Sequence, residues 1–290
     1  MAAQQRLIDA PLSMQMLRAS KTGHAKTDRA VNLRLIGLFA DRKIYAGAIG
    51  CFYYILKEIE TQLEQHASSD PRLAKYVAVA RPLYRASAFK QDLCFYFGHD
   101  QWEQELRRRS LFPAVQAYLD HLKALAGSQP LLLAAHSFTQ HLAVASGGQI
   151  ISKLVKKGLA LSQNQSQQQE LVGEGEEDEE EYKHCDGVSA FYFGAGVNPK
   201  DLKAALKECI DSLGDSELTE DEELGMIEEH KRAFEYNQGI ITGYQVGWQA
   251  PFVGAMKLAT RSRAVGAVMA ALIVAVSVFG WAIWKYSFSD

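Results

Sequence analysis

The sequence predicts an all-α protein, and three observations support this fold class. Nearly every long segment has apolar residues at steps of three or four, and no stretch alternates apolar and polar residues for long enough to indicate a strand. Prolines and capping residues punctuate these segments at helical lengths. The 290 residues are 48% hydrophobic, so the chain can bury a core. We therefore expect one helical domain over residues 13–245, after a flexible N-terminus of residues 1–12.

Two helices are predicted at the start of this domain. Ser13 can cap the first, which extends to about Val31. Its inward face is predicted to carry Leu17, Ser20, His24, Thr27 and Val31. Asp41 can cap the second helix, which extends to about Gln65. Its inward face is predicted to carry Ile44, Ala48, Cys51, Phe52, Ile55 and Ile59.

The middle of the chain is divided by Pro71, Pro82, Pro113 and Pro130. Between them we expect a helix over about 88–97, a short one near Trp102 and another over about 114–125. A helix interrupted by two glycines follows. Farther along, Asn198 as cap and Pro199 in the first turn begin a helix through about Leu213. Thr219 begins another that extends to about Gln245.

An acidic segment interrupts this pattern. Residues 162–186 carry nine acidic side chains and one lysine, a net charge of −8, so the total of −3 leaves about +5 for the rest of the chain. This charge balance argues against a general nucleic-acid binder. The segment is too polar to order itself, and we interpret it as a disordered insertion between helices. It is either simply solvated or a docking segment for a basic partner.

The four cysteines are far apart in the sequence. They are Cys51, Cys94, Cys185 and Cys209, and no two form a CxxC pair. This spacing is typical of a reducing compartment and argues against a structural disulfide or a zinc site.

The C-terminal end is predicted to be a membrane anchor. Residues 264–284 contain no charge over 21 residues, which is long enough for a helix to cross a bilayer. Basic residues precede this segment within a predicted linker, residues 246–263, and only a short tail, residues 285–290, follows. The positive-inside tendency then keeps the main domain in the cytosol. The alternative is a buried helix of a soluble protein.

The glycine-interrupted helix contains Ser146-Gly147-Gly148-Gln149 within a largely apolar run from Leu131. A glycine costs a helix about 1 kcal/mol relative to alanine, so an adjacent pair indicates a kink or a close approach of the backbone. Two explanations remain open from spacing alone, which are tight packing between helices and contact with a flat ligand.

His24 and a lysine stripe are the side chains best suited to bind such a ligand. His24 and Asp28 lie one turn apart, and a carboxylate beside an imidazole would fix its tautomer for metal binding. A core or surface histidine is the alternative. Lys200, Lys203 and Lys207 share one helix face, which could hold carboxylates at the mouth of a cleft or simply be solvated.

Taken together, these segments resemble those of the heme oxygenases. The run around Ser146–Gln149 is similar to the distal-helix signature of that family, and residues 19–24 are similar to the segment that supplies the proximal heme ligand. Residues 88–98 and 233–237 match two further structural strings in the right order. The resemblance covers roughly residues 10–245 and implies a helical bundle that holds heme between a proximal helix and a kinked distal helix.

The resemblance also implies roles for individual residues. His24 would bind the heme iron, and Asp28 replaces the glutamate that is usual one turn later. The residues implied to contact heme or its propionates are Arg18, Asp28, Phe138, Lys203, Lys207, Phe234 and Asn237. One basic position is usually arginine, and Phe138 replaces a tyrosine of the family. Asp92, in the 88–98 string, is equally suited to bridging helices and to chemistry.

The distal helix departs from the family pattern at two positions. Gly147 and Gly148 would let the backbone approach the heme face. However, Val144 stands where the family has an aspartate that organises pocket water, and Ala143 replaces a further glycine. Val144 cannot form a hydrogen bond with its side chain. Proton delivery would then rely on water and a polar neighbour such as Gln140 or His141.

Two functions follow from the resemblance. The first is a heme oxygenase that uses O₂ and electrons from an NADPH-dependent flavoprotein reductase to convert heme to biliverdin, carbon monoxide and ferrous iron. Slower turnover or relaxed regiospecificity would follow from Val144. The second is a membrane-tethered heme carrier, sensor or scaffold that does not cleave heme efficiently. In either case we expect a tail-anchored protein of the endoplasmic reticulum, monomeric unless the anchor oligomerises.

Overall fold

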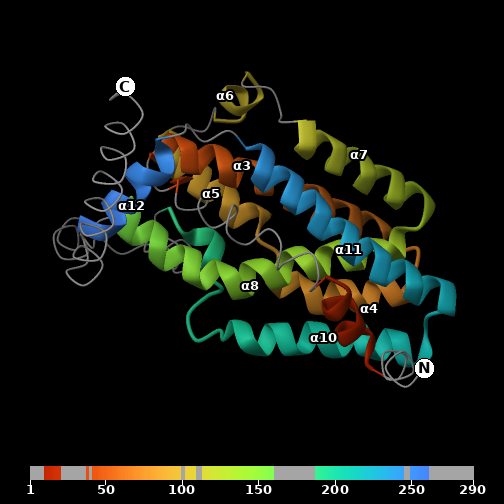
Figure 1. Cartoon of the computed structure of the whole chain (residues 1–290). Helices are drawn as coiled ribbons and strands as arrows, with labels where there is room; N and C mark the ends of the chain where they lie inside the picture. Colours follow the sequence, from red (N-terminus) through yellow and green to blue (C-terminus); the bar gives the residue numbers. More distant parts are fainter. Residues whose placement is uncertain are drawn as a thin grey trace, which may run out of the picture.

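The computed structural model describes residues 10–20, 37–38, 41–98, 102–108, 113–159, 187–244 and 249–260. Helices account for all the regular structure in these ranges, which confirms the predicted all-α class. Figure 1 shows long helices that lie alongside one another in layers, with α8 (Leu133–Gly158) and α11 (Glu220–Gly243) crossing the middle of the molecule. A side-chain cap sets where four of these helices begin.

The first long helix, α3, runs through the centre of the core. It spans Arg42–His66, and its cap is Asp41, whose carboxylate accepts a hydrogen bond from the Lys43 N–H. This confirms the predicted start. α3 packs against α5 (Ala86–Phe97), α7 (Pro113–Ser128) and α8 (Leu133–Gly158). Because it has neighbours on several sides, its middle is buried almost all round, where amphipathicity alone predicted one inward face.

A proline is the first or second residue of four elements in the middle of the chain. The elements are α4 (Pro71–Ala80), the 3₁₀ turn η1 (Arg81–Leu83), α7, and the 3₁₀ turn η2 (Pro130–Leu132). Proline suits the first turn of a helix because the N–H that it lacks has no partner there. The short helix near Trp102 is α6 (Trp102–Arg108).

The two predicted caps in the C-terminal half are confirmed. Asn198 caps α10 (Pro199–Ser216) through its side chain. Thr219 and Glu222 form a reciprocal capping box at the start of α11 (Glu220–Gly243). α8 packs against both α10 and α11. A further helix, α12 (Ala250–Thr260), lies within the segment predicted as a linker.

The predicted cap at Ser13 is wrong. Residues 12–20 are helical, so Ser13 lies in the first turn rather than before it. Its backbone N–H and its hydroxyl both donate to the carboxylate of Asp211 in α10, over 2.7 and 2.9 Å. A side chain 198 residues away therefore satisfies this helix end, which local sequence could not indicate.

Asp92 bridges two elements. It is fully buried in α5, and its two carboxylate oxygens accept the backbone N–H groups of Ser189 and Ala190, over 2.7 and 2.9 Å. These residues open the 3₁₀ turn η3 (Ser189–Phe191). Of the two roles left open for Asp92, the structure shows the structural one, because it anchors the chain just after the acidic segment.

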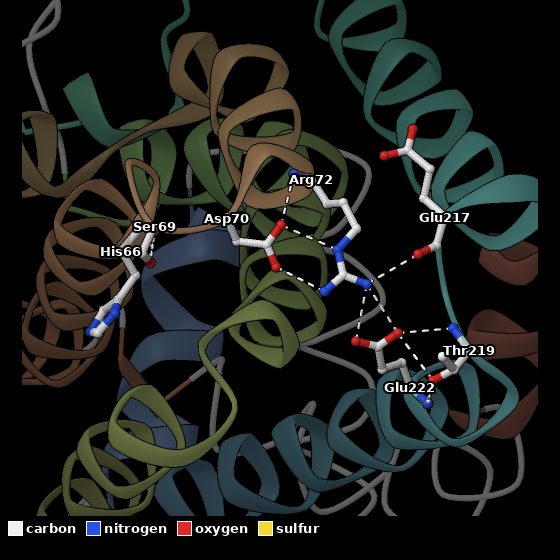
Figure 2. Close-up of polar contacts among 7 residues, drawn as sticks. All are labelled: His66, Ser69, Asp70, Arg72, Glu217, Thr219 and Glu222. Carbon is white, nitrogen blue, oxygen red and sulfur yellow. Dashed lines mark hydrogen bonds and ion pairs between the residues drawn. The ribbon is translucent and has the colours of Figure 1, made fainter.

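Arg72 ties α4 to the turn between α10 and α11, as Figure 2 shows. Its Nε and Nη2 donate to the carboxylate of Asp70, while Nη1 donates to the Glu217 carbonyl and to both oxygens of Glu222. Asp70 also caps α4 by accepting the Arg72 backbone N–H. One guanidinium thus joins two helix N-termini that are far apart in the sequence.

Several predicted segments lie outside the described residues. These are residues 1–9 of the predicted flexible start, the predicted first helix beyond residue 20, the acidic insertion and residues 264–284. The last residue of the predicted flexible start, Leu12, is instead helical and buried, because it packs in the hydrophobic core. Among the residues that are described, no helix combines the length and the apolar character needed to cross a membrane.

Replacing Arg72 tests the role of this clamp. Arg72 hydrogen bonds lower the pKa of Asp70, and the pKa of Glu222 is lowered by the Thr219 backbone N–H and then by Arg72. We expect Arg72→Met to reduce the free energy of unfolding by about 1–2 kcal/mol at neutral pH, because the partners are partly exposed. Since both folded-state pKa values are depressed, this contribution is present above the unfolded pKa values and disappears as pH falls through the folded ones. Urea unfolding at neutral pH and near pH 3 measures both effects.

Lys75→Met is the matched control for this experiment. Lys75 pairs with Glu217 in the same region, but its side chain is 62% exposed. Lys75→Met is expected to lower the free energy of unfolding by less than about 0.5 kcal/mol. Equal losses for the two variants would contradict the role given to Arg72.

Candidate functional site

One face of α8 is exposed and made mostly of small residues. Ala143, Gly147 and Ile150 follow at steps of four and three, and Ser146 lies beside them. All four are exposed, Ile150 by 65%. A Cβ added to Gly147 would meet no atom within 4 Å. The backbone of α8 is therefore accessible at Gly147. The α-helix continues through both glycines.

The second glycine has a different neighbour. Gly148 is buried, and a Cβ built there would lie 2.5 Å from Cδ1 of Phe191. Gly148 thus allows the η3 turn to pack against α8. Close packing, one of the two explanations offered for the glycine pair, therefore applies to Gly148, whereas contact with a flat ligand stays a prediction for Gly147. The two glycines differ because adjacent residues of a helix point about 100° apart.

A lysine lies at the edge of the exposed face. Lys203 of α10 is half-buried, and its Nζ donates to Ser146 Oγ over 3.0 Å. Lys207, one turn later, is also half-buried, whereas Lys200 is exposed. α10 thus brings one cation of the lysine stripe against α8, at the edge of its exposed face.

The other predicted distal residues lie deeper. Val144 is half-buried and packs against the hydrophobic core. Phe138 is fully buried, with its ring 5.8 Å from that of His230. The half-buried Phe234 ring lies 5.1 Å from the same histidine. His230 thus connects two of the aromatic residues that were predicted to lie at the heme site.

Asn237 is held by an amide of α8. Gln140 Nε2 donates to Asn237 Oδ1 over 2.8 Å and approaches the Tyr118 hydroxyl at 3.2 Å. His141, the other polar neighbour considered, is fully buried. It hydrogen-bonds to Ser137 within α8 and to Glu60 of α3. Gln140 is therefore linked to a predicted pocket residue, whereas His141 is engaged inside the core.

A second polar cluster was not predicted from the sequence. Glu229 Oε2 lies 2.6 Å from His121 Nε2 and 2.8 Å from His136 Nε2. Burial alone would raise the pKa of Glu229, but hydrogen bonds from His136 and His121 lower it to about 2. Burial lowers the pKa of His136, so that imidazole is neutral at neutral pH. The three residues come from different helices, and no local spacing relates them.

The predicted proximal side is described only at its start. Arg18 is exposed in the helical residues 12–20. His24 and Asp28 lie outside the described residues, so their roles as iron ligand and ligand partner stay predictions.

Known proteins with similar sequences share one description. The "Heme oxygenase" family model matches residues 10–242. Heme oxygenase 1 of Nostoc sp. is 27% identical, with 68% of this chain aligned to 70% of that protein. Heme oxygenase 2 of Oryctolagus cuniculus is 24% identical over 83% of this chain and 69% of its own. The heme oxygenase of Rhodella violacea is 26% identical over 54% of this chain, which spans 64% of that protein.

Solved structures agree with this relationship. Heme oxygenase 2 from Chlamydomonas reinhardtii, crystallised without heme, has a TM-score of 0.70 and 32% identity, with 82% of this chain matched to all of that one. Heme oxygenase-2 from Synechocystis sp., in complex with heme and NO, has a TM-score of 0.64 over 81% of this chain and 85% of its own. Its 21% identity supports the fold alone. Because the family match spans most of the chain and the fold agrees, this protein belongs to the heme oxygenase family, whose named relatives are enzymes.

Proposed function

We propose that this protein is a heme oxygenase, which opens heme to biliverdin, carbon monoxide and ferrous iron with O₂ and electrons from an NADPH-dependent reductase. The observation that carries the proposal is the exposed small-residue face of α8 with Lys203 at its edge. Family membership supplies the reaction, and this face supplies a surface in this chain that suits the substrate.

The described residues fit heme in shape and charge. A porphyrin needs a flat, largely apolar wall, which Ala143, Gly147 and Ile150 offer on α8. Its two propionates need cations at the rim, where Lys203 and Lys207 are half-buried on α10. Bound heme would supply the iron at which O₂ is activated.

The chain's own residues would position that group. Lys203 Nζ is held by Ser146 Oγ, so exchanging this neutral acceptor for a carboxylate would strengthen the contact without moving α10. Gly147 would allow close approach at the distal face. We propose His24 as iron ligand with Asp28 as its partner, and Arg18 as a further cation for a propionate.

Val144 is the reason to propose slow turnover or relaxed regiospecificity. An aspartate at this position would place an ionised acceptor beside the pocket, whereas Val144 adds only apolar surface. The two Gln140 Nε2 hydrogens are already donated to Asn237 Oδ1 and to the Tyr118 hydroxyl, so the group that can still donate to water is Nδ2 of Asn237. Amides do not change protonation state near neutral pH, so they order water without acting as a proton store.

The same observation supports the second candidate, a heme carrier, sensor or scaffold. Val144 packs on the core, and neither of the polar neighbours on α8 replaces the missing carboxylate. For both candidate functions we propose that residues 264–284 anchor the protein in the endoplasmic reticulum membrane, with the main domain in the cytosol. We also propose that the protein is a monomer unless the anchor oligomerises.

The proposed iron ligand is tested by His24→Ala. The full-length protein is expected to bind one heme with the absorption spectrum of a histidine ligand, and the variant is expected to lose that spectrum. Imidazole added to the variant should restore it, because the missing ligand is then supplied from solution. An unchanged spectrum would exclude His24 as the ligand.

A single-turnover assay with heme, reductase and NADPH separates the two candidate functions. Biliverdin and carbon monoxide are expected from the wild-type protein. Loss of heme without biliverdin or carbon monoxide would contradict the proposal that the protein is a heme oxygenase. Val144→Asp is expected to raise the rate of biliverdin formation by roughly a hundredfold, the lower end of what a positioned proton-transfer group contributes, and to reduce the number of biliverdin isomers formed. Val144→Asn is the matched control, because it is polar but not ionisable.

The two glycines provide a matched pair for the heme face. In the heme-free protein, Gly147→Ala is expected to raise the free energy of unfolding by about 0.5–1 kcal/mol, because the added Cβ meets no neighbour and alanine favours a helix. It is expected to weaken heme binding. Gly148→Ala should destabilise by about 1–3 kcal/mol, since its Cβ clashes with Phe191. Thermal unfolding and heme titration measure both. Unchanged heme affinity in Gly147→Ala would argue against this face as the heme wall.

A further inference from the structure

Three side chains of the kind that bind metals converge away from the exposed face of α8. They are His121, His136 and Glu229, and their donor atoms all lie within 4.8 Å of one another. α7, α8 and α11 each supply one of them. The proposed heme chemistry uses none of the three.

We propose that this cluster binds a divalent transition-metal ion of the Zn²⁺ class, which would link α7, α8 and α11. Two imidazole nitrogens and one carboxylate oxygen are a ligand set that such ions take, with water in the remaining position. Ca²⁺ and Mg²⁺ fit less well because they prefer oxygen ligands throughout. The proposal concerns a site separate from heme and does not depend on heme cleavage.

The geometry needs only a small expansion to hold the ion. Ligands at about 2.0–2.1 Å from a tetrahedral Zn²⁺ lie roughly 3.3 Å from one another. The two imidazole nitrogens now lie 2.6 and 2.8 Å from Glu229 Oε2, so each separation must grow by roughly half an ångström. His121 is best able to move, because its side chain is 17% exposed, whereas that of His136 is fully buried. The same exposure gives the ion and its water a path from solvent.

The neighbouring groups suit a metal site. Tyr118 Oη lies 2.9 Å from His136 Nδ1. When His136 Nε2 binds a metal, Nδ1 carries the hydrogen and can donate it to Tyr118, which is the kind of outer contact that orients metal-bound histidines. Arg232 donates to Glu229 Oε1 and leaves Oε2 for the ion. Its side chain is 42% exposed, so water screens its charge.

The alternative is that the cluster binds no metal ion and is held together by hydrogen bonds alone. In that state both imidazoles donate from Nε2 to the same carboxylate oxygen, and the three residues form a hydrogen-bonded link between helices. The two states differ in an observable way, because only the metal site gains stability from added Zn²⁺.

The experiment uses the full-length, heme-free protein after removal of metals with a chelator. We expect calorimetric titration with Zn²⁺ to show a binding event, Zn²⁺ to raise Tm, and Co²⁺ in its place to give the strong visible absorption of a four- or five-coordinate ion. His121→Ala is expected to weaken Zn²⁺ binding at least tenfold and to remove the Tm increase. Tyr118→Phe keeps all three ligands and should weaken binding roughly tenfold.

His66→Ala is the matched control, because His66 is a half-buried histidine at the end of α3, outside the cluster. It should leave Zn²⁺ binding and the Tm increase unchanged. The absence of a Zn²⁺-induced Tm increase in the wild-type protein, or Zn²⁺ binding that persists unchanged in His121→Ala, overturns the proposal. The heme absorption spectrum of each variant is recorded in parallel. A wild-type protein that binds Zn²⁺ but shows no heme absorption spectrum would count against the heme proposal alone.

Discussion

The structure depends on how the buried polar side chains of α8 find partners. All residues from Leu133 to His141 are buried, and five of these nine carry polar groups. A buried polar group without a hydrogen bond costs several times what the bond itself contributes, so each must be paired. The partners lie on α3, α7 and α11, apart from one pair within α8. These side-chain pairs are His136 with Tyr118 and Glu229, Ser137 with His141, Thr139 with His230, Gln140 with Asn237, and His141 with Glu60.

This pairing sets the rotation of α8 about its axis. A helix that turned by one residue would move each side chain by about 100° and break the hydrogen bonds to three neighbouring helices. This rotation also determines which residues in the second half of α8 face away from the core. Ala143 and Gly147 point away from the core, while Gly148 meets Phe191. The position of the exposed small-residue face is thus a consequence of the hydrogen bonding two turns earlier.

Val144 lies between the exposed face and the core, and it contributes apolar packing where an aspartate would need water or a partner. Gln140 and Asn237 keep one polar contact between α8 and α11 near the proposed pocket. Under the proposed function, stability therefore favours an apolar side chain at position 144, whereas proton delivery would favour a carboxylate.

The sequence by itself determined the helical class, the family resemblance and most helix starts. Asp41, Asn198 and Thr219 could be identified as caps because their side chains bond to N–H groups two or three residues away. Only the tertiary structure decided the partners of Ser13 and the division of tasks between Gly147 and Gly148. It also decided the convergence of the two histidines on Glu229. These contacts join residues distant in the chain, so they exist only once the packing of whole helices has fixed which faces meet.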